Sequence, residues 1–300
     1  MQYQHEQGES EYHDQGIWGL YSSIFPLKQA HTAGIFLQDQ IRVADQFFAT
    51  VGLRIDHHSQ FGTEVTYRLA PAYYIQHTGT KLKITYGTGF KSPSLYQLYA
   101  PGTLYGSIGN EDLNPEKSTG WDSGFEQHFL KGKIVFGATY FFNVFKDLIN
   151  FDFAKGYINI GRAESKGAEL FIHTHPIKEL VLKASYTKTD AKDKDTDTPL
   201  LRRPKHKLAV TLGYNFLEKG DVNLSLFHVG EREDVDTSSW PSSQVTLPSY
   251  TLLNTAFSFD ITPHIQIFIR LDNVLNVKYE MLKGYGTPGF SFYSGATISF

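Results

Sequence analysis

The chain of 300 residues carries 28 Lys and Arg against 31 Asp and Glu, and its net charge of −3 offers no reason to expect a nucleic-acid partner. It has no Cys, which excludes disulfides, thiolate metal sites and Cys nucleophiles, and no apolar run long enough to predict a transmembrane helix. Yet 15% of its residues are aromatic, among them 23 Phe and 18 Tyr, although its mean hydropathy is only −0.30.

Apolar and polar residues alternate along most of the chain, which is the pattern of strands with one apolar face. Near the N-terminus, for example, Phe47, Ala49, Val51, Leu53 and Ile55 share a face. The alternation predicts about 14 strands, near residues 3–13, 32–43, 47–56, 64–75, 81–89, 119–129, 133–146, 158–173, 179–189, 206–216, 221–229, 250–260, 264–273 and 291–300. No segment combines helical spacing with capping signals, so the predicted fold class is all-β.

Short and long connections alternate between these strands. The short turns lie near residues 44–46, 76–80, 130–132, 175–178, 217–220 and 262–263. The long polar connections lie near residues 14–31, 88–118, 148–157, 190–205, 230–249 and 276–290, with 57–63 as a shorter member of the set. This sorting is typical of an antiparallel transmembrane β-barrel, with both chain ends on the short-turn side. A β-sandwich need not sort its loops by length, and no propeller repeat is visible.

The aromatic residues fit the same prediction. A barrel in lipid is apolar outside, polar inside and ringed by aromatic side chains at both interfaces. Any single aromatic is better explained by core packing, but their collection at strand ends favours the rings. The last strand ends in Phe300, with Phe292 and Ile298 on the same face. This decapeptide resembles the C-terminal signal that the outer-membrane barrel assembly machinery reads. We therefore expect Phe292, Ile298 and Phe300 to direct assembly.

Six segments resemble the TonB-dependent outer-membrane receptors in order and spacing. They are residues 36–40 (FLQDQ), 51–56 (VGLRID), 87–99 (GTGFKSPSLYQLY), 109–118 (GNEDLNPEKS), 159–169 (NIGRAESKGAE) and 271–280 (LDNVLNVKYE). The resemblance implies a multi-pass barrel in the outer membrane of a Gram-negative bacterium, surrounded by lipid and lipopolysaccharide. It also implies a transporter that binds a scarce small-molecule nutrient and receives energy from TonB through a plug domain.

Residues 196–206 (TDTPLLRRPKH) look most like the cobalamin (vitamin B12) branch of that family. An RRPxH strand entry also occurs in siderophore and haem receptors, so the resemblance leaves three nutrients open: cobalamin, an iron–siderophore or haem.

The sequence also departs from a complete receptor of this family. We find no N-terminal signal, TonB box or plug-like segment, and the strands fall about eight short of a 22-stranded barrel. We therefore expect residues 1–300 to be one β-barrel domain, the C-terminal part of a 22-stranded barrel, without a plug and with two unpaired edges. The alternative is a self-contained 14-stranded outer-membrane pore.

The candidate substrate-facing residues lie in two long connections. Tyr96, Tyr99 and Tyr105 occupy an aromatic-rich stretch, and Tyr offers both an apolar ring and a hydrogen bond; the same rings would equally well stabilise the loop itself. Arg202 and Arg203 precede a strand and would meet anionic groups of a substrate or of lipid.

Other chemistry finds little support in the sequence. His57 and His58 are adjacent and point to opposite faces of a strand, and His173 and His175 have no third ligand nearby. Residues 190–198 (DAKDKDTDT) lack the Gly and the terminal Glu of a calcium loop. No P-loop, nucleophile elbow or HExxH motif is present. We expect no catalytic residue, metal or cofactor, and no enzyme.

Overall fold

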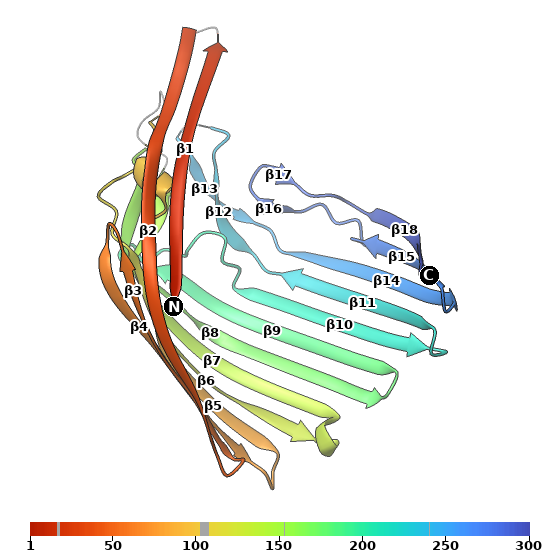
Figure 1. Ribbon diagram of the computed structural model, residues 1–300. Coiled ribbons are helices and arrows are strands. Elements are labelled where there is room, and N and C mark those ends of the chain that lie inside the picture. Colours follow the sequence, from red (N-terminus) through yellow and green to blue (C-terminus); the bar gives the residue numbers. More distant parts are fainter. Residues whose placement is uncertain (17–18, 103–107, 153, 240) are drawn as a thin grey trace.

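Fourteen strands form one antiparallel sheet in the computed structural model, which describes residues 1–300 apart from 17–18, 103–107, 153 and 240 (Figure 1). The first seven strands are β1 (Gln2–Gly16), β2 (Gly19–Val43), β3 (Phe47–His58), β4 (Gly62–Ile75), β5 (Thr80–Lys91), β6 (Glu116–Phe129) and β7 (Ile134–Asp152). The next seven are β8 (Gly156–Ile177), β9 (Leu180–Asp193), β10 (His206–Phe216), β11 (Gly220–Val229), β14 (Tyr250–Thr262), β15 (Ile265–Asp272) and β18 (Ser291–Ile298). The prediction of 14 strands in an all-β fold is confirmed.

Each strand pairs with its neighbours in chain order, and the sheet curls into an open trough (Figure 1). Within the described residues, β1 pairs only with β2 and β18 only with β15. The two edges therefore stay apart, and the alternative of a closed 14-stranded barrel is wrong for this structure. The same residues include no plug-like domain, since every strand belongs to the sheet or to a hairpin in its loops.

The two chain ends lie at different levels of the wall. At the C-terminus, the Ser299 N–H donates to the His264 carbonyl in the short β14–β15 turn, as expected. At the N-terminus, Gln2 pairs with Gly34, while β2 continues down to Val43. The expectation that both ends lie on the short-turn side is therefore wrong for the N-terminus.

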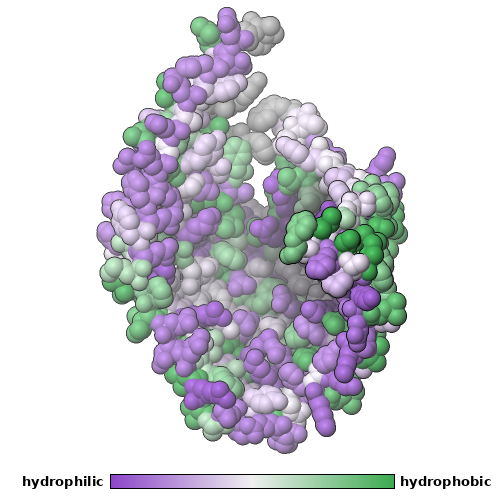
Figure 2. Space-filling view, turned by 45° about the vertical axis from the view of Figure 1, so that its right-hand side comes forward, coloured by the Kyte–Doolittle hydropathy of each residue, from purple (hydrophilic) through white to green (hydrophobic). Residues whose placement is uncertain are grey.

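The sheet has two chemically different faces, here called the outward face and the inner face. In β10, Val210 lies between Ala184 and Leu226 on the outward face, whereas Thr211 lies between Lys183 and Ser225 on the inner face. The registers carry this alternation across the sheet. The hollow of the trough is lined by the inner face, where hydrophilic residues are frequent (Figure 2). An apolar exterior around a polar hollow is the arrangement of a barrel wall in lipid.

The aromatic side chains of the outward face gather in pairs, across neighbouring strands or, for Phe216 of β10 and Phe259 of β14, across the strand β11 between them. Tyr67 and Tyr86 lie 6.0 Å apart between ring centroids, and Trp121 and Tyr140 lie 5.6 Å apart. Nearer the short turns, the ring of Phe216 stacks on that of Phe259 at 6.0 Å. These clusters occupy both ends of the outward face, as the predicted aromatic girdles require.

The long connections contain more structure than predicted. The predicted connection 14–31 is wrong, because Gly8–Gly16 continue β1 and pair with residues 19–28 of β2. This hairpin rises beyond the wall (Figure 1), where neither face needs to be apolar, so the alternation disappears from the sequence. Two further hairpins, β12 (Arg232–Asp236) with β13 (Ser243–Leu247) and β16 (Glu280–Leu282) with β17 (Tyr285–Gly286), lie within the predicted connections 230–249 and 276–290.

Helix α1 (Leu95–Tyr99) is the one α-helix of the described residues, and a single 3₁₀ turn follows β6 at Leu130–Gly132. A capping box starts α1: the Gln97 N–H donates to the Ser94 hydroxyl, and the Ser94 N–H donates to the Gln97 side chain. Neither helix is long and apolar enough to cross a membrane.

Candidate functional site: the loop-bearing rim

The loop-bearing rim gathers four long connections: β5–β6, β9–β10, β11–β14 and β15–β18. The opposite rim carries only tight turns, such as the one at Ala44–Gln46. A polar hollow that opens between long loops can admit a solute from one side, so we take this rim as the candidate site.

The β5–β6 connection folds against the inner face of the β1–β2 hairpin through α1. Phe25, Ala30 and Leu95 form a buried apolar cluster, and Tyr99 packs against it. The Lys28 ammonium lies 4.0 Å from the centroid of the Tyr99 ring, and the Tyr99 hydroxyl accepts a hydrogen bond of 2.8 Å from the Gln60 amide. Tyr99 therefore holds the loop to the wall. This matches the alternative stated from the sequence, that these rings stabilise the loop itself.

Tyr96 differs from Tyr99, although both lie on α1. The centroid of its ring lies 6.5 Å from that of Phe25 and 6.3 Å from that of Tyr157, both in edge-to-face geometry. The residue is still 51% exposed. Its hydroxyl has no hydrogen-bond partner within the part of the chain that the structure describes. Tyr96 is thus positioned by two rings and free to meet a solute. The third predicted tyrosine, Tyr105, lies outside the described residues.

Arg202 belongs to a contact that joins three loops, here called the loop clasp (Arg202, Asp234 and Lys283). The Arg202 Nε donates to one carboxylate oxygen of Asp234 at 2.8 Å, and the Lys283 backbone N–H donates to the other at 2.8 Å. The Arg202 N–H also donates to the Glu233 carbonyl at 2.7 Å. These residues come from the β9–β10, β11–β14 and β15–β18 connections, so Arg202 fastens loops together.

Asp234 is the centre of the clasp and has no exposed surface. Burial alone raises the pKa of Asp234, but the N–H groups of Lys283 and Val235 and the Arg202 guanidinium outweigh burial and hold the pKa below the ordinary carboxyl value. Asp234 is therefore a carboxylate at neutral pH. Sequence analysis missed it, because a lone Asp in a long loop shows no sign of burial.

A second arginine strengthens the same loop contact. Arg232 donates through its guanidinium to the carbonyl of Glu280, which belongs to the β15–β18 connection. Its guanidinium also lies 5.3 Å from the ring of Tyr250, and that ring stacks on Tyr279 at 4.3 Å. The β11–β14 and β15–β18 connections therefore form one packed unit.

Arg203 and its neighbour Arg202 are both exposed, but Arg203 takes no part in the clasp. Its one hydrogen bond within the described ranges is a long one, of 3.4 Å, to the Arg202 carbonyl. The predicted pair thus divides into a clasp residue, Arg202, and a free cation, Arg203.

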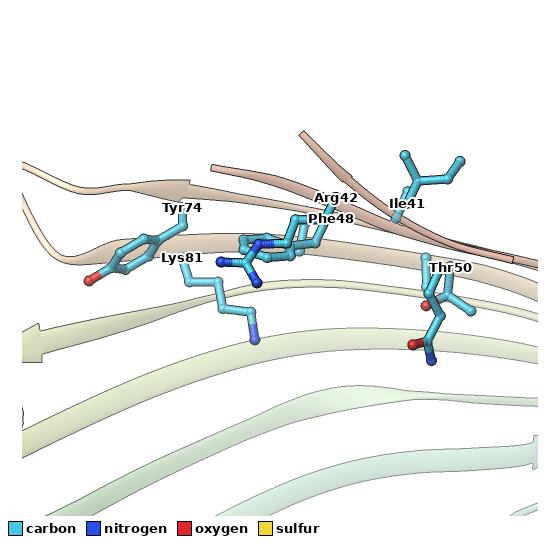
Figure 3. A pocket seen from close by; sticks show the side chains of 10 residues that line it. Ile41, Arg42, Phe48, Thr50, Tyr74 and Lys81 are labelled. Atoms are coloured by element: carbon cyan, nitrogen blue, oxygen red, sulfur yellow. The ribbon is translucent and has the colours of Figure 1, made fainter. Parts of the chain in front are cut away.

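The inner face also holds a cavity of about 760 Å³ near the short turns (Figure 3). Arg42, Phe48, Thr50, Tyr74 and Lys81 line it. Nearby, Lys83 is paired with Glu126 at 2.9 Å. Charged and hydrogen-bonding side chains at this level make the hollow suitable for a polar solute.

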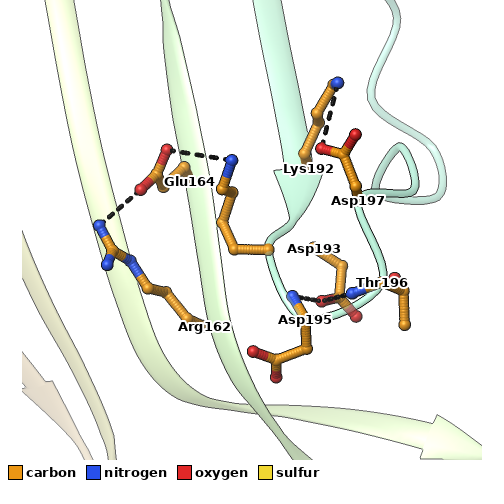
Figure 4. Close-up of polar contacts among 8 residues, drawn as sticks. Arg162, Glu164, Lys192, Asp193, Asp195, Thr196 and Asp197 are labelled. Atoms are coloured by element: carbon orange, nitrogen blue, oxygen red, sulfur yellow. Dashed lines mark hydrogen bonds and ion pairs between the residues drawn. The ribbon is translucent and has the colours of Figure 1, made fainter.

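The Asp-rich stretch of the β9–β10 connection forms a turn (Figure 4). Asp193 accepts the N–H groups of Asp195 at 2.8 Å and Thr196 at 3.3 Å, and Asp197 pairs with Lys192 at 3.3 Å. The carboxylates of Asp193 and Asp197 are thus engaged, one by the turn and the other by lysine. In the residues that the structure describes, no group of three or more His, Asp or Glu could hold a metal ion.

Comparison with known proteins gives a family and a fold. The family model described as TonB dependent receptor-like, beta-barrel, matches residues 1–274. A mutant ferric enterobactin receptor from Pseudomonas aeruginosa matches with a TM-score of 0.75 at 20% identity, over 91% of this chain and 45% of its own. The siderophore receptor PirA from Acinetobacter baumannii matches with a TM-score of 0.76 at 19% identity, over 91% of this chain and 46% of its own. The copper transporter OprC matches with a TM-score of 0.78 at 16% identity, over 99% of this chain and 52% of its own. The chain spans about half the length of these structures, which at such identities share its fold.

Proposed function

The chain belongs to the TonB-dependent receptor-like β-barrel family, and from this membership we propose that it forms the wall and loops of a receptor that takes up a scarce nutrient. The family resemblance found in the sequence is thereby confirmed, and with it the placement in the outer membrane as a multi-strand β-barrel wall. The observation that carries the proposal is the polar inner face beneath loops that are held together at one rim.

For the substrate we propose a metal-containing organic nutrient. An iron–siderophore ranks first, because the names of several matched receptors refer to ferric enterobactin, a siderophore or ferripyoverdine. Cobalamin and haem follow, supported only by the sequence of residues 196–206. The cobalamin branch receives no support from the receptors named here, which are siderophore receptors and a copper transporter.

The partners follow from the same proposal. TonB would act through a plug domain, so the 14 strands would be part of a 22-stranded wall that surrounds it. Lipid and lipopolysaccharide would surround the outward face, and the barrel assembly machinery would insert the strands. Transport requires no bond-making by the chain, and we propose no enzymatic activity.

Uptake by the cell that encodes the chain tests this proposal. We expect disruption of the gene to abolish uptake of one radiolabelled nutrient among an iron–siderophore, cobalamin and haem. Tyr96→Ala should weaken binding of that nutrient about 10-fold, since loss of one ring contact and its hydrogen bond costs roughly 1–2 kcal/mol. Tyr3→Ala is the matched control, because Tyr3 is similarly exposed but lies on the outward face of β1. Unchanged uptake of all three nutrients would contradict the proposal.

Assembly gives a second, independent prediction. Phe292 and Ile298 lie on the outward face of β18, opposite Leu271 and Ile265, and Phe300 is fully exposed after the last strand. We propose that these three residues are read during insertion. Deletion of Phe300 should therefore remove most of the folded chain from the outer membrane, as measured by its heat-modifiable band on gels. Phe300→Tyr keeps the ring and should assemble normally; equal loss in both variants would contradict the proposed signal.

A further inference from the structure

The outward face changes from apolar to cationic at one place on the wall. Toward the loops, the outward rows of β7, β8 and β9 carry five cations, Lys146, Arg162, Lys166, Lys188 and Lys192. Beyond Lys146 and Arg162, β7 and β8 continue as a paired hairpin to Asp152 and Gly156. The outward positions at the same ends of β11, β14 and β18 are His228, Thr251 and Phe292 instead. Lys117 of β6 lies opposite Lys146, but it is paired with Glu64. The five cations of β7, β8 and β9 are here called the cationic patch (Lys146, Arg162, Lys166, Lys188 and Lys192).

Two carboxylates, Glu164 and Asp190, lie on the outward face among these five cations, so the patch keeps an excess of positive charge. Asp190 lies opposite Lys166 in the register, but the described residues show no ion pair between them. Glu164 accepts from Arg162 at 2.6 Å and lies 4.0 Å from Lys194, while Lys192 pairs with Asp197 (Figure 4). Lys146, Lys166 and Lys188 are exposed and have no ion pair within the described ranges. Three ammonium groups therefore stand on the outward face without a protein partner.

The height of these residues matches the polar boundary of a bilayer. A tilted strand rises about 2.5 Å per residue along the membrane normal. Lys188 is eight residues from the lower end of β9 and Lys166 eleven from that of β8, which places them about 20 and 28 Å above it. The apolar band of such a barrel is about 25 Å tall. Tyr140 and Tyr186 lie just beneath the two lysines, as interfacial aromatics do.

We propose that the cationic patch binds the phosphate groups of a phosphorylated glycolipid in the outer leaflet. An outward-facing ammonium at this depth meets lipid head groups, and an anionic head group is the partner that its charge favours. The acyl chains of the same molecule would lie on the apolar residues directly below the patch, such as Leu170 and Ala184. One ligand would thus pair with the free ammonium groups through its phosphates and cover the apolar surface beneath them with its acyl chains. The inference requires placement in the outer membrane but not the proposed uptake.

The test compares two double variants of the whole chain in micelles of a zwitterionic detergent. Lys166→Gln with Lys188→Gln removes two charges from the outward face. Lys183→Gln with Lys207→Gln removes two charges from the inner face of β9 and β10. The probe is bis-phosphorylated lipid A, and native mass spectrometry measures the bound fraction. We expect about a 10-fold loss of affinity for the outward variant, given the attraction of two lysines near an anionic surface, and less than a twofold loss for the inward variant.

Three further arms separate the possible sources of binding. Dephosphorylated lipid A should bind both variants and the native chain equally, and inorganic phosphate at the same concentration should not displace the glycolipid. Bound lipid A should decrease as salt rises, because partly exposed charges are screened. The proposal would be overturned if the two double variants lost affinity equally, or if neither lost any. It would also be overturned if inorganic phosphate displaced the glycolipid fully, or if binding did not depend on salt concentration. The salt series uses the native chain, so it holds even if a variant fails to fold.

Discussion

Replacement of Asp234 by Asn is expected to release the three loops of the loop clasp while the sheet stays folded. The buried carboxylate accepts from the Arg202 guanidinium and from the Lys283 backbone N–H. Loss of one partner in a buried charged contact costs about 3 kcal/mol. Amide hydrogen exchange at Lys283 should therefore accelerate roughly 100-fold, since each tenfold step corresponds to about 1.4 kcal/mol. Exchange in the centre of β10 should not change, because its hydrogen bonds belong to the sheet.

A matched control lies on the same hairpin. Asp236 is half-buried, and among the described residues its carboxylate accepts hydrogen bonds only from Ser238. The Lys283 ammonium acts on it through charge alone, so Asp236→Asn should leave exchange of the Lys283 backbone N–H nearly as it is. Equal acceleration in both variants, or none in Asp234→Asn, would contradict the role given to Asp234.

The loop clasp should also respond to acid. Because the pKa of Asp234 is lowered in the folded chain, its stabilising contribution is complete above the ordinary carboxyl pKa of about 4 and disappears as pH falls through the lower folded value. Loop exchange at Lys283, corrected for the intrinsic pH dependence of exchange, should stay constant from neutral pH down to about pH 4 and rise below it. In Asp234→Asn this acid step should be absent.

Arginine placed on the outward face should cost far more than arginine on the inner face. Ala184 lies between Ile172 and Val210 on the outward face of β9, whereas its neighbour Ser185 lies between Phe171 and Ala209 on the inner face. Arg near the bilayer midplane costs about 2–4 kcal/mol on the lipid face of a barrel. Ala184→Arg should therefore lose that amount of stability in lipid, and Ser185→Arg less than about 1 kcal/mol.

Reversible denaturation in phospholipid vesicles measures this difference. The two substitutions occupy adjacent positions and add the same side chain, so strand propensity and charge are matched. Equal costs would mean that the outward face is not in contact with lipid, and that the assignment of the two faces is wrong.

The strands could be predicted from the sequence because lipid requires apolar side chains on one face of each strand, while the hollow accepts polar side chains on the other. Apolar and polar residues therefore alternate with a period of two. Leu208, Val210 and Leu212 must be apolar, and their neighbours Lys207, Thr211 and Asn215 are free to be polar. Where the chain extends beyond the bilayer, this constraint is absent, and the strands cannot be predicted from alternation. In the upper part of the β1–β2 hairpin, Gly8–Gly16 are almost all polar, while Leu20 and Ile24 of β2 lie on one face and Tyr21 and Phe25 on the other. This segment lacks the period-two pattern, so the sequence predicts a connection there.

The candidate site was predicted less well than the strands. Tyr96, Tyr99, Arg202 and Arg203 were chosen for their chemistry, and the structure separates them by their contacts. Tyr99 and Arg202 hold loops in place, whereas among the described residues the Tyr96 hydroxyl has no hydrogen-bond partner and Arg203 makes one long hydrogen bond to the Arg202 carbonyl. Asp234 could not be found, because its burial depends on three connections that lie far apart in the chain.

The sequence by itself determined the fold class, the 14 strands, the outward apolar face and the family, because each depends on local alternation or on short motifs. Only the tertiary structure decided that the sheet stays open, that the N-terminal hairpin rises beyond the wall, and that Asp234 joins three loops. It also assembled Lys146, Lys166 and Lys188 into one patch. These features depend on register and on contacts between distant residues, and a linear pattern carries no information on either.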